Sequence, residues 1–206
     1  GVVALVMVRP FVDVDDNELS DDQIVEKYYP LFIGPSWRRD GRGEWDLPKW
    51  TLGWEIAAWC ARNLNSLDDD APEGTGFRFT MEQFRFVLHW YAVDELGEFV
   101  YRRSVLQRMK GWGKDPLLAV LAIVEFVGPC RFGGWGKNGL PVARLQSRSL
   151  VQVAAVSKEQ TNNTMDLIPS LMTDGLRRAQ GIKDGIEFVR ASGGRRLMGV
   201  TSNYRT

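Results

Sequence analysis

"LQRMKGWGKDPLLAVLAIVEFV", residues 106–127, joins a short loop with glycines and lysines to an apolar segment of helical length. Backbone N–H groups can converge on a phosphate when a loop contains glycines, a lysine follows them and a helix begins at once. This stretch supplies Gly111, Gly113 and Lys114, and then a proline at a position that the first turn of a helix tolerates. It therefore predicts a phosphate-binding loop followed by a buried helix over 117–127.

Two residues depart from the usual phosphate-loop pattern. Arg108 stands where the first glycine is expected, and a side chain there makes a left-handed backbone costly. Asp115 replaces the Ser or Thr that normally holds Mg²⁺; a carboxylate can bind this metal but repels phosphate when the metal is absent. Lys110 precedes Lys114 by four residues, a position suited to stabilising charge on a γ-phosphate. The alternative interpretation is a basic turn between a strand and a helix.

The charges are distributed unevenly, although the net charge is zero. Residues 1–70 carry 14 acids and 7 bases, whereas residues 71–206 carry 12 acids and 19 bases. Within 99–148 there are nine bases and only two acids, Asp115 and Glu125. Such a local excess suits the phosphates of a nucleotide or a nucleic acid, and the alternative is an ordinary solvated basic face.

The composition excludes several classes of protein. The length of 206 residues, with 44% hydrophobic residues and eight Trp, is that of one domain with a substantial core. Cys60 and Cys130 lie far apart, which argues against a disulfide framework or a zinc site and fits a reducing compartment. His89 is the only histidine, so a His-based triad or metal site is not expected; it should pack or hydrogen-bond within its helix. The apolar segments 1–8 and 117–127 are too short to span a bilayer.

Hydrophobic periodicity and turn residues predict an α/β fold with a central, largely parallel sheet. A Thr80–Gln83 capping box should open a helix that continues through residue 96. Residues 1–8 are expected to be a buried strand or the ragged end of a longer chain. The other expected elements are a weakly structured arm or long loop over 13–50, a helix over 51–64, a loop over 67–76, strands over 98–108 and 149–157, a turn region over 133–141, a capped helix start over 157–172, and a hairpin over 185–202 that turns at Gly193-Gly194.

From Thr51 onward, several segments appear in a familiar order. They are TLGWEIAAWC, MEQF, the loop GWGKDP, SLVQVAAVSKEQTNNTM and GGRRLMGVTS. With them, the chain resembles the N-terminal ATPase portion of the large terminase subunit of tailed bacteriophages, of the type found in actinobacterial phages. The resemblance implies a P-loop NTPase core of the ASCE type over 51–206, preceded by an N-terminal arm over 1–50.

The resemblance also implies roles for single residues. The family's loop lacks the first glycine and has a basic residue four before its lysine, which accounts for Arg108 but not for Asp115. Lys114 and Lys110 would be catalytic, and Asp115 would contact Mg²⁺. The residues expected to bind ATP are Gln83, which would read the adenine, and Arg108, Gly111, Trp112, Gly113, Lys114 and Asp115.

Gln160 and Thr161 resemble a helicase-type coupling motif and would lie near the carboxyl end of a strand. The alternative for that segment is a capped helix start alone, with Ser157 and Glu159 in its first positions.

ATP hydrolysis in this family needs an apolar strand that ends in Asp-Glu. The string YAVDEL, residues 91–96, precedes the loop and lies on the helical pattern of 80–96, and FVDVDD, residues 11–16, also comes too early. By the resemblance, the Asp-Glu strand would follow residue 206 and a nuclease domain would come later. We therefore expect a partial ATPase domain that does not sustain turnover alone.

The function implied by the resemblance is the ATP-binding part of the viral DNA-packaging motor. Its partners would be double-stranded DNA, the portal protein, the small terminase subunit and further copies in a ring, in the host cytoplasm. Two alternatives stay open: a DNA- or partner-binding remnant with a degenerate phosphate loop, and another ATPase with a similar core, such as a helicase.

Overall fold

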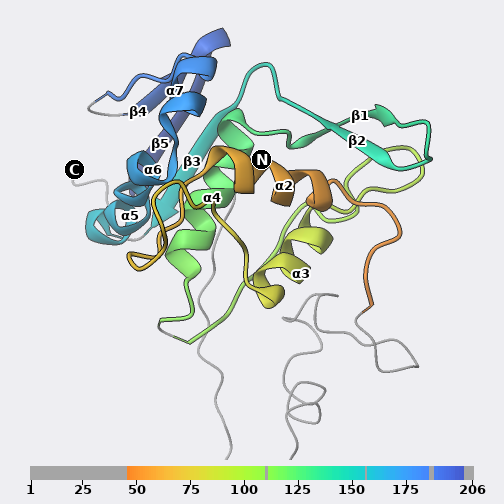
Figure 1. The fold of residues 1–206 in the computed structure, drawn as a ribbon, viewed down its shortest axis with the longest axis horizontal. Helices are drawn as coiled ribbons and strands as arrows, with labels where there is room; N and C mark the ends of the chain where they lie inside the picture. Colours follow the sequence, from red (N-terminus) through yellow and green to blue (C-terminus); the bar gives the residue numbers. More distant parts are fainter. Residues whose placement is uncertain (1–45, 110, 156, 186–187, 202–206) are drawn as a thin grey trace, which may run out of the picture.

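The computed structural model (Figure 1) describes residues 46–109, 111–155, 157–185 and 188–201. The strand predicted over 1–8, the acidic string over 11–16 and almost all of the predicted arm over 1–50 lie outside these residues, and so does Lys110.

The described residues form a mixed α/β fold with two small sheets. In chain order the elements are α2 (Gly53–Asn63), α3 (Met81–Trp90), α4 (Lys114–Val127), β1 (Arg131–Trp135), β2 (Pro141–Arg144), β3 (Leu150–Ala155), α5 (Lys158–Met165), α6 (Leu167–Leu171), α7 (Asp174–Gln180), β4 (Phe188–Ala191), the short 3-10 turn η3 (Ser192–Gly194) and β5 (Arg195–Thr201).

Helix α4 is the centre of the core. Every residue of 117–127 except Leu118 is buried, because the segment is apolar on all faces and α2, α5, α6, β3 and β5 pack around it. The helix predicted over 117–127 is thereby confirmed, and it begins earlier, at Lys114. Neither α4, at 14 residues, nor any other helix in the described part of the chain is long and apolar enough to cross a membrane.

The larger sheet has the strand order β3-β5-β4. Strands β3 and β5 are parallel, whereas β4 and β5 form the predicted antiparallel hairpin, which turns at Gly193 and Gly194. Along β3, Val151 and Val153 are buried while Leu150 is exposed, as expected of a strand with one face on the core. A largely parallel sheet is therefore not confirmed within the described residues, where the larger sheet has one parallel and one antiparallel strand pair and the smaller sheet has one antiparallel pair.

Local helix signals were sufficient for α2, α3 and the start of α5. In α3, Thr80 Oγ1 accepts from the Gln83 backbone N at 3.3 Å and Gln83 Oε1 accepts from the Thr80 backbone N at 3.0 Å, which confirms the capping box. Ser157 caps α5 through the backbone N of Gln160. Helices α2 and α3 approach closely at Gly53, where a Cβ would lie 2.9 Å from the Leu88 Cα.

The strand predicted over 98–108 is wrong. Val93 forms a bridge with Phe99, but among the described residues no strand pairs with the rest of the segment. Apolar and β-branched residues favour a strand only when a neighbouring strand accepts their backbone hydrogen bonds.

The predicted end of the helix that begins after Thr80 is also wrong: the helix was expected to continue through residue 96, but α3 ends at Trp90. Ala92 bridges to Thr51, and Asp94 Oδ1 then accepts hydrogen bonds from the backbone N of Leu96 and of Glu98. The string YAVDEL therefore ends in an exposed turn that Asp94 stabilises.

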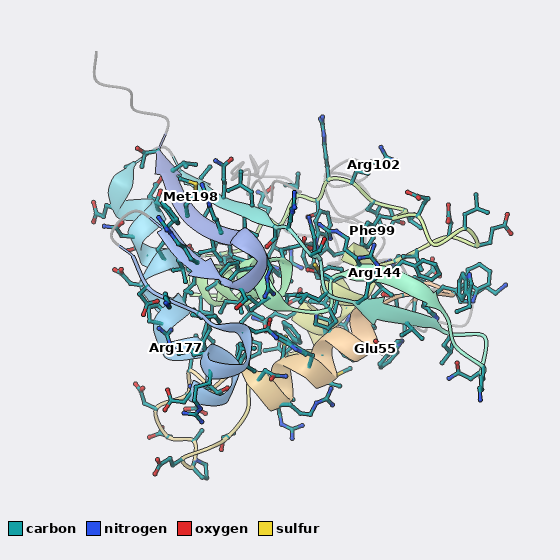
Figure 2. The ribbon with its side chains drawn as sticks, turned by 90° about the horizontal axis from the view of Figure 1, so that it is seen from above. Glu55, Phe99, Arg102, Arg144, Arg177 and Met198 are labelled. Atoms are coloured by element: carbon teal, nitrogen blue, oxygen red, sulfur yellow. The ribbon has the colours of Figure 1, made fainter. Side chains whose placement is uncertain are left out.

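The turn region predicted over 133–141 is only partly correct. Residues 131–144 form the antiparallel hairpin β1–β2, with the turn confined to 136–140. The hairpin extends away from the larger sheet (Figure 1). Glu55 of α2 lies beside the strand that carries Arg144 (Figure 2), and its Oε2 accepts from the Ala143 backbone N at 2.8 Å.

The environments of His89 and the two cysteines are set by burial. His89 is buried, as the first of the two predicted alternatives has it, and its hydrogen bond leaves its helix: Nε2 donates to the carbonyl of Asp46 at 2.8 Å. Cys60 and Cys130 are both buried and free. Burial raises the pKa of both thiols, that of Cys130 to about 12, so neither is poised to react as a thiolate at neutral pH.

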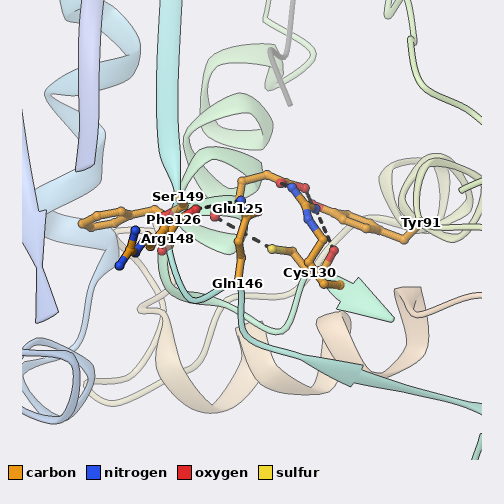
Figure 3. A network of polar contacts seen from close by, with 8 residues as sticks. Tyr91, Glu125, Phe126, Cys130, Gln146, Arg148 and Ser149 are labelled. Atoms are coloured by element: carbon orange, nitrogen blue, oxygen red, sulfur yellow. Dashed lines mark hydrogen bonds and ion pairs between the residues drawn. The ribbon is translucent and has the colours of Figure 1, made fainter. Parts of the chain in front are cut away.

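A buried polar network joins the end of α4 to the hairpin (Figure 3). Tyr91 Oη donates to Glu125 Oε1 at 3.0 Å, and an Arg131 guanidinium nitrogen lies 2.9 Å from Glu125 Oε2. Burial and the neighbouring Glu125 raise the pKa of Tyr91, so its phenol keeps the proton that it donates. The Glu125 side chain is only 8% exposed, so both of its partners are needed to compensate the buried charge.

We expect Glu125→Gln to lower the free energy of unfolding by about 3 kcal/mol, because it leaves the charge of Arg131 without its partner in a largely buried position. Tyr91→Phe is the matched control: it removes one hydrogen bond to a charged group and should lower this free energy by about 2 kcal/mol. Urea unfolding of both variants checks the ranking. A smaller loss for Glu125→Gln than for Tyr91→Phe would contradict the assigned network.

Burial lowers the pKa of His89 below its ordinary value of 6.5, so the folded state keeps the ring neutral. The unfolded chain takes up the proton at a higher pH than the folded chain does. The stability contributed by this residue is therefore present above about pH 6.5 and decreases as the pH falls toward the folded-state pKa. His89→Gln, which retains an N–H donor, should lose less unfolding free energy between pH 7.5 and 5.5 than the wild type, as measured in urea. Equal losses in the two proteins would contradict this assignment.

Candidate functional site

The loop over 108–113 leads directly into α4. Its backbone turns at Gly111 (φ +86°) and Gly113 (φ +91°), a region that side chains rarely adopt. A Cβ at Gly113 would lie 3.3 Å from the Gln83 side-chain nitrogen, whereas none of the described atoms lies within 4 Å of a Cβ at Gly111. The two predicted loop glycines are thus required for different reasons, the first for conformation alone and the second for conformation and space.

Lys114 is the first residue of α4, and its side chain folds back over the loop. Its Nζ donates to the carbonyls of Arg108 at 3.0 Å and of Met109 at 2.7 Å. Gly113 is the N-cap of α4, and no side chain caps this helix. The N–H groups of the first turn and the positive end of the helix dipole are therefore not satisfied by a capping side chain, as in an anion-binding site.

Asp115 lies in the first turn of α4 and is exposed. The helix dipole favours a carboxylate at this position, and the side chain has no hydrogen bond or ion pair with any described residue. In the described part of the chain no group of three or more His, Cys, Asp or Glu side chains is arranged to hold a metal ion. A metal at Asp115 would therefore need further ligands from a bound molecule or from water.

Glu82 belongs to this site, although the sequence analysis did not identify it. Its Oε1 accepts from Arg108 Nη2 at 2.6 Å, and its Oε2 accepts from Trp112 Nε1 at 2.7 Å. The Arg108 guanidinium also lies 5.2 Å from the centroid of the Trp112 ring. One glutamate on α3 thereby contacts both ends of the loop.

Gln83 follows Glu82 and is buried against the loop. Its side-chain oxygen is engaged by the Thr80 backbone N, and its side-chain nitrogen lies next to Gly113. The structure therefore places Gln83 beside the loop, with its amide nitrogen close to Gly113, and its role toward adenine stays a prediction.

Gln160 and Thr161 lie on α5, away from this cluster. Gln160 is exposed, whereas Thr161 is buried and its Oγ1 donates toward the carbonyl of Val200 at 3.3 Å. A Cβ at Gly199 would lie 2.5 Å from the Thr161 methyl carbon, so α5 and β5 touch at this point. Within the described residues neither side chain hydrogen-bonds to the loop, and Thr161 serves to pack α5 on the sheet.

The structure therefore brings most of the sequence-predicted site together at one end of α4. The members of the cluster are Gln83, Arg108, Gly111, Trp112, Gly113, Lys114 and Asp115, joined by Glu82. Helix α4 begins on the side of the molecule on which β3 and β5 end (Figure 1), which is where ligands bind in open α/β sheets.

Comparison with known proteins relates the chain as a whole, and not this site, to bacteriophage proteins. No protein-family model matches the chain. The chain is 37% identical over 191 residues to the Gene 13 protein of Mycobacterium phage L5 and 36% identical over 193 residues to that of Mycobacterium phage D29. In each case the match covers 84% of this chain and 32% of the relative, so the chain spans about a third of the length of these relatives.

Among solved structures, the crystal structure of the HK97 bacteriophage large terminase has a similar fold, with a TM-score of 0.52 and 18% sequence identity. The match covers 76% of this chain and 28% of that one. The resemblance to the large terminases of bacteriophages, inferred from the motifs, is confirmed by this likeness in fold.

Gly111→Ala and Gly113→Ala form a matched pair that tests the loop geometry. Each should lower the free energy of unfolding by about 1–2 kcal/mol, because alanine is strained at positive φ. Only Gly113→Ala should also displace the Gln83 side chain and speed hydrogen exchange at the backbone amide of Thr80, because this amide donates to Gln83 Oε1. Urea unfolding and amide exchange measure the two effects. Equal exchange at this amide in both variants would contradict the close contact between Gly113 and Gln83.

Proposed function

We propose that this chain, which has a terminase-like fold and mycobacteriophage relatives, is the ATP-binding part of a viral DNA-packaging motor. In the proposal its core is a P-loop NTPase of the ASCE type, and ATP hydrolysis in the complete motor drives double-stranded DNA into the procapsid. The observation that supports it best is the loop before α4, where two glycines with positive φ precede a lysine and a helix without a side-chain cap.

The residues present fit a nucleotide phosphate. The partners of Lys114 are two neutral carbonyls, and a phosphate oxygen is a stronger acceptor for an ammonium group. Lys114 would hold the β- and γ-phosphates, while the N–H groups of the loop and of the first turn of α4 would face them. Lys110, which lies outside the described residues, stays in the proposal as a second cation for the γ-phosphate.

The adenine would lie beside Gln83. The oxygen of this side chain already accepts from Thr80, so the amide nitrogen is the group that it can offer to an acceptor on the base. Trp112, held against Glu82, would form part of the wall of the site.

Mg²⁺ would be held by Asp115 together with phosphate oxygens and water, since Mg²⁺ commonly keeps several water ligands. Hydrolysis would need a further carboxylate to activate water. In the described part the acidic pair Asp94-Glu95 lies in an exposed turn, and Asp94 is occupied with backbone N–H groups. We therefore propose that these 206 residues bind ATP but do not sustain its turnover.

The partners in this proposal are double-stranded DNA, the portal protein, the small terminase subunit and further copies of the chain in a ring. The place of action is the host cytoplasm, at the portal of the procapsid. Gln160 and Thr161 remain candidates for coupling hydrolysis to movement, through the contact of Thr161 with β5.

A second candidate function is a DNA- or partner-binding module without ATPase activity. It is favoured by Asp115 and by the charge of the hairpin region: residues 126–157 contain Arg131, Lys137, Arg144 and Arg148 but no acid. Of these four, Arg131 is neutralised by Glu125, and the other three are exposed.

Lys114→Ala should weaken the binding of ATP–Mg²⁺ at least about tenfold, a loss of about 1.4 kcal/mol, because it removes the cation that holds the β- and γ-phosphates in this proposal. Lys137→Ala, which removes an exposed lysine in the hairpin turn, is the matched control and should bind as the wild type does. Titration calorimetry measures both. Unchanged affinity in Lys114→Ala would favour the binding module, and sustained Lys114-dependent hydrolysis by these 206 residues would contradict the proposed lack of turnover.

A further inference from the structure

We propose that Glu82 is a positioning residue of the loop, whose single carboxylate fixes both ends of the loop through Arg108 and Trp112. In this role Glu82 fixes the backbone of the loop from outside, so the loop keeps its shape although Arg108 stands where the usual phosphate loop has its first glycine. The inference deepens the proposed ATP site and rests on it for its consequence in binding, but the contacts themselves involve no nucleotide.

The Glu82 carboxylate bridges two residues at opposite ends of the loop. Arg108 and Trp112 are four positions apart on the loop, and Glu82 lies 26 and 30 positions before them. Each carboxylate oxygen serves one partner, at 2.6 Å and 2.7 Å, so neither loop end can move away without breaking a bond to an ionised group. The Arg108 guanidinium also makes a cation–π contact with the Trp112 ring, so each of the three side chains contacts the other two.

The position of Glu82 on α3 is itself fixed. Glu82 lies in the first turn, where the helix dipole favours a carboxylate, and the Thr80–Gln83 capping box on either side of it defines that turn. The next residue, Gln83, meets the loop at Gly113. Two consecutive residues of α3 therefore contact the beginning and the end of the loop.

This arrangement explains the unusual arginine. Among the described residues only glycines have positive φ, so Arg108 does not adopt the left-handed conformation that a first glycine permits. Its guanidinium is directed to Glu82 and its side chain is 13% exposed, while its backbone carbonyl accepts from Lys114. Arg108 therefore holds the loop and presents a carbonyl to Lys114, and its charge is committed to Glu82.

The first experiment needs no nucleotide. In a ¹⁵N–¹H spectrum of the chain, Trp112→Phe identifies the indole signal of Trp112 by its loss. Glu82→Ala should move this signal upfield, as expected when a hydrogen bond to a carboxylate is lost, and should speed amide exchange over 108–114. The control is Glu55→Ala, which also removes a carboxylate from the first turn of a helix but bonds to the hairpin. An unmoved Trp112 signal in Glu82→Ala would overturn the proposal.

The second experiment measures ATP–Mg²⁺ affinity in Glu82→Ala, Arg108→Gln and the double variant. Each single substitution should weaken binding about tenfold, and the double variant should be no weaker than the worse single one, because both remove the same contact. Losses that multiply would mean that Glu82 acts independently of Arg108, and wild-type affinity in Glu82→Ala would mean that it does not position the loop; either result overturns the proposal.

The two experiments separate this inference from the proposed function. If Lys114→Ala leaves ATP binding unchanged, the proposed function fails, while the Trp112 indole signal still decides whether Glu82 holds the loop. If Glu82→Ala does not fold, Trp112→Phe removes only the hydrogen bond from Trp112 to Glu82 and should still weaken ATP binding measurably. Wild-type affinity in that variant would then count against the proposal.

Discussion

The burial of α4 on every side is the constraint from which the rest of the structure follows. A helix with no polar face must be covered all round, and here α2, α5, α6, β3 and β5 cover it. Each fully buried aliphatic or aromatic side chain stabilises the fold by about 1.5–3 kcal/mol, so α4 cannot shift along its axis without losing several such contributions. The N-terminus of α4 is therefore fixed in space, and a short loop attached to it inherits that rigidity.

The two ends of α4 use polar groups differently. At the C-terminal end, Glu125 is enclosed with Tyr91 and Arg131, and its charge serves to attach the hairpin β1–β2 to the core. A buried ion pair of this kind contributes little net stability compared with an apolar contact, but breaking it is costly. The pair therefore fixes the start of the hairpin, at Arg131, against the C-terminal end of α4. At the N-terminal end the polar groups remain accessible, since Gly113 provides no capping side chain and Asp115 is exposed. The same helix thus has one closed end and one end that is available to a ligand.

The parts of the fold that the sequence predicted are those that neighbouring residues determine. The apolar run of α4, the Thr80–Gln83 capping box and the Gly193-Gly194 turn each depend on residues a few positions apart. The strand over 98–108 failed because pairing depends on a partner elsewhere, and the hydrogen bond of His89 was not foreseen because its acceptor, Asp46, lies 43 positions away. The two glycines with positive φ and the helix that follows them lie where the sequence placed them, and phosphate binding stays a prediction. Glu82 was missed because a glutamate is common at the start of a helix, and nothing nearby in the sequence indicates that it reaches Arg108 and Trp112.

The structure shows which of the basic residues over 99–148 are paired with acids and which are exposed. At the loop and the adjoining first turns, the positive charges of the described residues Arg108 and Lys114 are balanced by Glu82 and Asp115. Affinity for phosphate at this place must therefore come from direct contacts with the Lys114 ammonium group and the N–H groups, from the helix dipole and from any metal ion, with the net charge of the loop contributing little. Among the described residues the remaining excess consists of exposed side chains: Lys137, Arg144 and Arg148 on the hairpin and the segment after it, and Arg102 and Arg103 before the loop. None of these side chains forms an ion pair with an acid in the described part of the chain, whereas the charges at the loop are balanced, so the two phosphate-related signals in the sequence lie in different parts of the described structure.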